Sequence, residues 1–172
     1  EYQAGQVALA GEYYEVVRQD LENDGLDAAE EQFQAMRDAV GDHGYAGLAG
    51  LHMASAYVDD GRLGRAEEIY REILDQRRLK SLWPIATLRL VRVLEAQEDH
   101  QVALALIDEP APTGFETAWA EARGDLLFEL GRLDEARTAW QEALDGQGEE
   151  GMGSFLIQLK LDAAGAPSGE TS

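Results

Sequence analysis

One short pattern recurs four times along the 172-residue chain, and it constrains the fold more than any other feature of the sequence. In each copy a small residue is followed four positions later by a large apolar one: Ala29 with Phe33, Ala66 with Tyr70, Ala103 with Ile107, and Ala136 with Trp140. The four alanines are separated by 37, 37 and 33 residues. A period of this length is typical of a solenoid, in which each unit buries its apolar face only by stacking on its neighbours.

Each copy of the pattern predicts a pair of helices. The copies occupy Leu51–Asp75, Leu88–Glu109 and Ala122–Gly146, with a weaker one at Tyr13–Val40. Apolar residues recur at steps of three and four on both sides of a short polar turn, which is the spacing of amphipathic helices. Gly61 and Gly131 lie at that turn, and Gly25 lies at the corresponding bend of the first copy, where we expect a left-handed glycine to end a helix. The third copy has Glu98 where glycine is expected.

The last copy resembles the tetratricopeptide consensus most closely, at Gly124, Gly131, Ala136, Trp140, Ala143 and Leu144. We therefore predict an all-α fold, a tetratricopeptide-like helical-hairpin solenoid of about four helix pairs with a C-terminal capping helix. The helices are expected over residues 3–22, 26–41, 45–59, 63–79, 84–97, 100–108, 115–130, 133–145 and 154–164. Residues 1–164 would form the repeat domain with its capping helix, and residues 165–172 a disordered tail.

Composition narrows the classes of function. The chain has 14 basic and 34 acidic residues and a formal net charge of −20, so it would repel nucleic-acid phosphates and anionic lipid surfaces. It lacks cysteine, which removes thiol catalysis and thiolate metal sites. The stretch Gly146–Gly151 spells a nucleotide-binding G-x-G-x-x-G motif, but it follows a predicted helix rather than a strand and carries two glutamates. We predict no catalytic residue, no metal, no cofactor and no enzymatic activity.

A more specific resemblance rests on four strings: YAGLAGLHMASAYVDDGRLGRAE, LRLVRVLEAQEDHQVALALID, RGDLLFELGRLDEARTAWQEAL and FLIQLKLD. Together they resemble the periplasmic domain of the YfgM family, the ancillary subunit of the bacterial SecYEG translocon. The resemblance implies a membrane anchor upstream of Glu1, and it places the domain on the periplasmic side of the inner membrane. It also implies association with the SecYEG translocon and a PpiD-like periplasmic chaperone, assisting secreted or envelope proteins, and it brings no catalytic residues. The alternative is a generic tetratricopeptide scaffold for cell-envelope or regulatory complexes.

The first helix of each pair lines the concave face of such a solenoid, so helical register supplies candidate partner-binding residues. These are Arg18, Leu51, His52, Ser55, Arg89, Arg92, Glu121, Asp125 and Phe128. The arginines are candidate anchors for a carboxylate or an acidic segment, because a guanidinium group can pair with a carboxylate through two hydrogen bonds. Internal pairing of Arg89 and Arg92 with Glu121 and Asp125 is the alternative. Leu51 and Phe128 would contact an apolar partner surface or pack between repeats.

Overall fold

The structure, a computed structural model, describes residues 2–23, 25–147 and 151–165, and all regular structure in those residues is helical. It confirms the predicted all-α fold. The elements are α1 (Tyr2–Asn23), α2 (Leu26–Val40), α3 (Gly44–Asp59), α4 (Leu63–Asp75), the 3-10 helix η1 (Arg77–Leu82), α5 (Trp83–Ala96), α6 (His100–Leu106), α7 (Glu116–Glu129), α8 (Leu133–Gln147) and α9 (Met152–Gly165). The chain divides into two compact units, one ending at Gln97 and the other beginning at Glu98.

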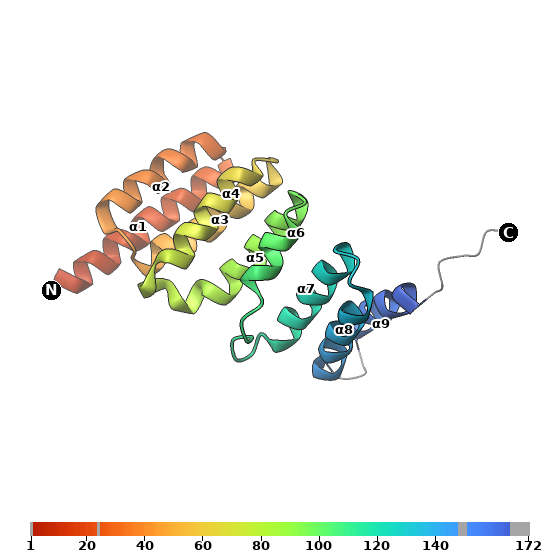
Figure 1. The fold of residues 1–172 in the computed structure, drawn as a ribbon. Coiled ribbons are helices and arrows are strands. Elements are labelled where there is room, and N and C mark those ends of the chain that lie inside the picture. Colours follow the sequence, from red (N-terminus) through yellow and green to blue (C-terminus); the bar gives the residue numbers. More distant parts are fainter. Residues whose placement is uncertain (1, 24, 148–150, 166–172) are drawn as a thin grey trace. The chain divides into compact units, whose positions relative to one another are not determined.

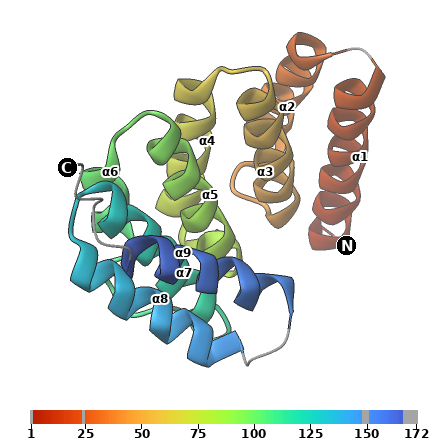
Figure 2. The same ribbon diagram turned by 90° about the vertical axis from the view of Figure 1, so that its right-hand side faces the viewer.

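The first unit contains α1 to α5 and is built from helical hairpins (Figure 1). Helix α1 pairs with α2 and α3 with α4, α1 and α2 both pack on α3, and α5 packs on α4. Figure 2 shows these hairpins following one another in chain order. The small and large residues of the first two repeats, Ala29, Phe33, Ala66 and Tyr70, are all buried in this unit. The repeat pattern therefore marks the contacts that join the helices, as its spacing predicts.

The second unit contains α6 to α9. Helices α7 and α8 form a hairpin, α6 packs on α7, and α9 packs on α8. Its core includes Ala136 and Trp140 from the repeat pattern together with Ile157 from α9. Gly124 on α7 faces Trp140 so closely that a Cβ atom at position 124 would overlap the indole ring. The glycine of the repeat consensus is thus required for the close approach of the two helices.

The residues at the predicted turns have positive φ angles. Gly25, Gly61 and Gly131 have φ angles of 90°, 78° and 74°. Glu98, the residue that stands in for glycine, also has a left-handed φ of 65°. An L side chain is disfavoured in this conformation because its Cβ crowds the following carbonyl. Glu98 therefore has the positive φ of the turn glycines without being the residue that suits it.

The prediction of one helix over residues 63–79 is wrong, because α4 ends at Asp75 and η1 follows it. The indole Nε1 of Trp83 donates hydrogen bonds to the carbonyl oxygens of Ile73 (3.1 Å) and Gln76 (3.2 Å), so these groups at the end of α4 are satisfied by a side chain. Leu79 turns inward and is buried beside Gly47 of α3.

The other predicted helix ends lie within two residues of those observed. Of the predicted tail, Gly165 ends α9 and residues 166–172 lie outside the described residues.

Candidate functional site

In the first unit, α1 and α3, the first helices of the two pairs, carry a surface of mixed polar and apolar side chains. Leu48, His52, Ser55 and Val58 form one exposed row along α3, at the steps of three and four residues that keep them on one helix face. Tyr14 and Arg18 on α1 are half-buried and one helical turn apart, and Tyr14 contacts that row through His52. These six residues are called the α1–α3 surface below. They include Arg18, His52 and Ser55, which were predicted to contact a partner, and Leu48, which was not among the predicted residues.

A hydrogen bond and aromatic contacts hold the α1–α3 surface together. The hydroxyl of Tyr14 lies 3.1 Å from Nε2 of His52, and the Tyr14 ring lies 5.5 Å from that of Tyr45. His43 stacks on Tyr45, and its Nδ1 accepts a hydrogen bond from the Tyr45 backbone N–H at the start of α3. The residues that cap α3 thus also position the aromatic end of the surface. Such a surface offers hydrogen-bonding groups beside exposed apolar side chains, a mixture suited to a protein or peptide partner.

The predicted arginine anchors each have neighbours inside the first unit. Arg18 pairs weakly with two glutamates of its own helix, at 4.0 and 3.6 Å, and Arg92 lies 3.4 Å from Glu95. Arg89 lies beside the hydroxyl of Tyr70. Burial raises the pKa of Tyr70, and the charge and hydrogen bond of Arg89 oppose that rise. A carboxylate ligand would therefore compete with existing contacts, which are weak where the side chains are exposed to solvent.

Two predicted contact residues of the second unit, Glu121 and Asp125, are bound by a lysine that the sequence analysis missed. Nζ of Lys160 on α9 lies 2.9 Å from Glu121 and 2.7 Å from Asp125, both on α7. Asp125 also accepts a hydrogen bond of 2.9 Å from the indole of Trp140. Burial alone would lower the pKa of Lys160, but the two carboxylates raise it above its ordinary value. We call Lys160, Glu121 and Asp125 the α7–α9 clamp.

The two predicted apolar contacts differ in exposure. Leu51 is only 7% exposed, so its side chain packs in the core of the first unit, which was the alternative considered for it. Phe128 is 40% exposed, and its other side rests on Trp140, with the ring centroids 5.6 Å apart. The side chain of Phe128 is thus exposed to a partner, whereas that of Leu51 is buried in the core.

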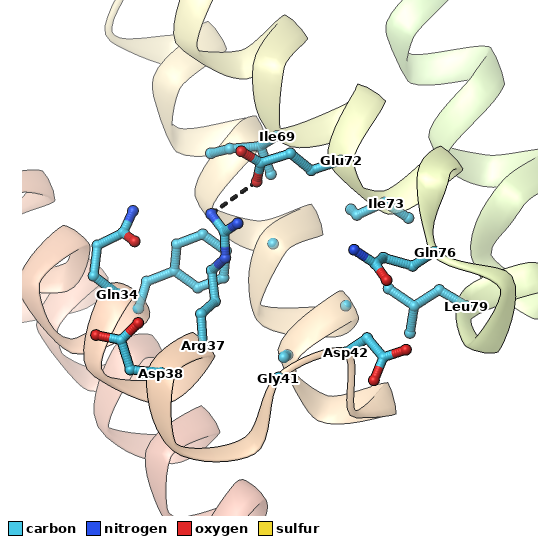
Figure 3. Close-up of a pocket in the computed structure, with 14 residues that line it drawn as sticks. Gln34, Arg37, Asp38, Gly41, Asp42, Ile69, Glu72, Ile73, Gln76 and Leu79 are labelled. Carbon is cyan, nitrogen blue, oxygen red and sulfur yellow. Dashed lines mark ion pairs between the residues drawn. The ribbon is translucent and has the colours of Figure 1, made fainter.

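A cavity of about 370 Å³ lies between α2, α3 and α4, and sequence reasoning gave no sign of it. Ile69 and Ile73 supply apolar walls (Figure 3). Phe33 belongs to the same lining. Arg37 and Glu72 approach each other within it, with Nη1 and Oε2 2.8 Å apart. Gly50 belongs to the same lining, and a Cβ there would lie 3.3 Å from Ile73. The cavity therefore depends partly on residues without side chains, which hydropathy patterns do not reveal.

A charged network joins the three helices that surround this cavity. The Glu30 carboxylate on α2 accepts hydrogen bonds from Arg65 on α4 and from Gln34, each 2.7 Å long, and from the hydroxyl of Tyr57 on α3. Partial burial raises the pKa of Glu30, but these hydrogen bonds together lower it below its ordinary value. Burial and the adjacent Glu30 carboxylate raise the pKa of Tyr57. The network fixes the spacing of α2, α3 and α4 through groups that satisfy one another.

Comparison with protein families assigns this helical architecture. The model of the tetratricopeptide repeat-like domain matches residues 1–166, which is nearly the whole chain. The chain belongs to this family. The sequence predicted three features of this tetratricopeptide repeat-like domain. They are the helical hairpins, the small residue followed four positions later by a large apolar one, and the left-handed turns.

Two curated relatives give the domain a more specific similarity. The chain is 29% identical over 118 residues to the ancillary SecYEG translocon subunit of Neisseria gonorrhoeae, and 27% identical over 118 residues to that of Escherichia coli. Each alignment covers 69% of this chain, and 56% and 57% of the respective relative. The chain therefore matches a little over half the length of these proteins. The predicted resemblance to ancillary translocon subunits is confirmed as distant homology.

Solved structures support the same fold. MamA (residues 41 to the end) from Desulfovibrio magneticus RS-1 superposes with a TM-score of 0.67 at 16% identity, covering 91% of this chain and 89% of that one. A double mutant of MamA from RS-1 gives the same TM-score and identity, covering 91% and 86%. At this identity the likeness concerns the fold alone.

None of the helices that the structure describes has the length and apolar character required to cross a membrane.

Proposed function

We propose that this tetratricopeptide repeat-like domain is a non-enzymatic docking module on the periplasmic side of the bacterial inner membrane. It would associate with the SecYEG translocon and with a PpiD-like chaperone, and so assist proteins that emerge into the periplasm. The observation that carries this proposal is the distant homology to two proteins named ancillary SecYEG translocon subunit. The family fold supports it, because repeat solenoids offer extended surfaces for other proteins.

The α1–α3 surface is the contact surface that we propose in the first unit. Leu48 and Val58, each 37% exposed, add apolar contact to the polar groups of Tyr14, His52 and Ser55. Arg18 adds a positive charge in a chain with a net charge of −20, where a cation is uncommon. A surface with few large apolar groups favours contacts that exchange readily rather than a permanent interface.

Such a module would act by placement rather than by chemistry. Restriction to the membrane surface by an upstream anchor would raise its effective concentration beside the translocon, so that weak contacts suffice.

In the second unit, Phe128 is the proposed apolar contact, because it combines 40% exposure with a fixed position on Trp140. Arg89 and Arg92 remain proposed anchors for acidic segments of a partner.

Site-specific photo-crosslinking in the full-length protein tests this proposal. A photoreactive residue at Ser55 or Phe128 is expected to capture a translocon subunit or a prolyl-isomerase-type chaperone, identified by mass spectrometry. The control position is Arg71 on α4, which is exposed and lies outside the α1–α3 surface. Capture of neither partner from Ser55 and Phe128, or equal capture from Arg71, would contradict the proposal.

A further inference from the structure

Helix α9 is apolar on two faces. One face, with Ser154, Ile157 and Ala164, is buried in the second unit, and Leu161 packs partly against the same core. The other face carries Met152, Phe155, Leu156 and Leu159, which are 73%, 58%, 48% and 48% exposed. The spacing of these four residues places them in one row along the helix. We call this row the α9 stripe.

The α9 stripe is unusual for a helix at the end of the repeats that the structure describes. Terminal helices of solenoids generally present a polar outer face, because no further repeat covers them. A helix that is apolar all round is normally buried on all sides. Helix α9 follows the α7–α8 hairpin and packs on α8, but it has no second helix in the described residues to complete a hairpin of its own. The stripe is thus an exposed apolar row that has the spacing of a helix-packing face.

The position of α9 is fixed independently of the stripe. Lys160 ties it to α7 through Glu121 and Asp125. On α8, the guanidinium group of Arg137 donates a hydrogen bond to the backbone carbonyl of Ala164, near the end of α9. These polar contacts and the buried Ile157 hold one face of the helix down and turn the stripe outward. The apolar row is therefore presented by an ordered helix rather than by a frayed end.

The charge of the second unit selects the kind of helix that would cover the stripe. Residues 98–172 include 16 acidic and only 4 basic side chains, and Lys160 is already bound in the clamp. Asp162 is exposed on α9 one turn beyond Leu159. Two copies of such a unit repel each other, whereas a cationic helix is attracted. We propose that the α9 stripe docks an amphipathic α-helix of a partner protein that carries basic residues beside its apolar face.

Synthetic helical peptides and the full chain provide the test. Three peptides are compared by isothermal titration calorimetry: one with leucines at helical spacing and lysines elsewhere, the same with glutamates in place of lysines, and a lysine peptide with the leucines scrambled. The first is expected to bind at least about tenfold more tightly than either of the others, a readily measured difference. Binding to the scrambled lysine peptide alone reports general attraction to an acidic protein.

Two matched variants separate the stripe from that general attraction. Leu156→Glu changes the stripe, and Leu133→Glu changes a leucine of similar exposure, 42%, at the start of α8. Both add one negative charge, so pure electrostatics would tighten binding of the lysine peptide equally. We expect Leu156→Glu to weaken binding at least about tenfold and Leu133→Glu to leave it unchanged or slightly tighter. Circular dichroism checks that both variants keep their helices.

The proposal is overturned if the two variants bind alike, if the glutamate peptide binds as well as the lysine peptide, or if no peptide binds. It is also overturned if light scattering shows a dimer of the wild type that Leu156→Glu converts to a monomer, because a second copy would then be the occupant. Binding to phosphatidylcholine vesicles that Leu156→Glu abolishes would assign the stripe to lipid instead. None of these results bears on the translocon association proposed above, which is read from crosslinks at Ser55 and Phe128.

Discussion

Nζ of Lys160 lies 2.7 Å from Oδ1 of Asp125, and the same carboxylate oxygen accepts the indole N–H of Trp140. One acidic side chain thus joins α9 to both helices of the hairpin on which α9 rests. The sequence separates Lys160 from Asp125 by 35 residues, so the contact belongs to the tertiary fold and not to any one helix.

Replacement of Lys160 by methionine is expected to loosen α9. It leaves Glu121 and Asp125 without their cation while keeping most of the side-chain length, and the loss should be about 1–3 kcal/mol of the free energy of unfolding. Urea unfolding followed by circular dichroism measures it. The other lysine supplies the control, since Lys80→Met removes an exposed charge near Trp83 and should change stability by less than about 0.5 kcal/mol. Equal effects of the two substitutions would show that the clamp does not hold α9.

Glu98→Gly is expected to stabilise the protein. Glu98 has a φ of 65°, a conformation that glycine adopts freely and an L residue adopts at an energetic cost. Relief of that cost should raise the free energy of unfolding by about 1 kcal/mol. The converse control, Gly131→Ala at a φ of 74°, should lower stability by a similar amount. Thermal unfolding of both variants checks the pair, and a destabilised Glu98→Gly protein would mean that the Glu98 side chain makes a compensating contact.

The Glu30 network predicts a dependence of stability on acid. The pKa of Glu30 is lower in the folded chain than in the unfolded one, so its contribution is present above the unfolded pKa of about 4.3. It is lost as the pH falls through the lowered pKa of the folded state. Glu30→Gln should therefore be less stable than the wild type by about 1–2 kcal/mol at neutral pH. That difference should shrink as the solution is acidified below the unfolded pKa.

Urea unfolding at a series of pH values between neutral and about 3 measures this difference. The exposed neighbour Glu31 gives a matched control, because Glu31→Gln makes the same chemical change outside the network. A stability difference for Glu30→Gln that stays constant down to the lowest pH would contradict the linkage.

Gly124 and Gly64 predict opposite outcomes for the same substitution. A Cβ at position 124 would overlap Trp140, so Gly124→Ala should separate α7 from α8 and lower stability by about 1–3 kcal/mol. A Cβ at position 64 on α4 would meet no atom within 4 Å, and alanine favours the helix, so Gly64→Ala should be neutral or slightly stabilising. Differential scanning calorimetry distinguishes them, and equal midpoints would remove the packing role assigned to Gly124.

The sequence was informative where structure depends on neighbouring residues. Helical periodicity predicted the hairpins, and glycine predicted the left-handed turns at Gly61 and Gly131 and the bend at Gly25. The prediction of where a helix ends failed at α4, where side-chain contacts outside the helix decide its last residue. Residues 76–79 continue the helical pattern of α4, but the indole of Trp83 binds the carbonyls at its end, and Leu79 packs beside Gly47 instead.

The candidate site was less predictable than the fold for the same reason. Register alone placed His52 and Ser55 on an exposed helix face, which the structure also has. It could not show that Leu51, their neighbour, is buried, because that depends on how closely the adjacent helices approach. Nor could it pair Lys160 with Glu121, which requires the docked position of α9.

The order of the hairpins has a consequence for how the chain reaches its native state. In the first unit every helix packs on helices close to it in sequence, and in the second unit α7, α8 and α9 succeed one another in the same way. Contacts of short sequence separation close small loops and require little chain entropy to form, so folding is expected to be fast. If the chain is released gradually from a channel with its N-terminus first, each hairpin can therefore fold as soon as it has left the channel, before the C-terminal residues follow.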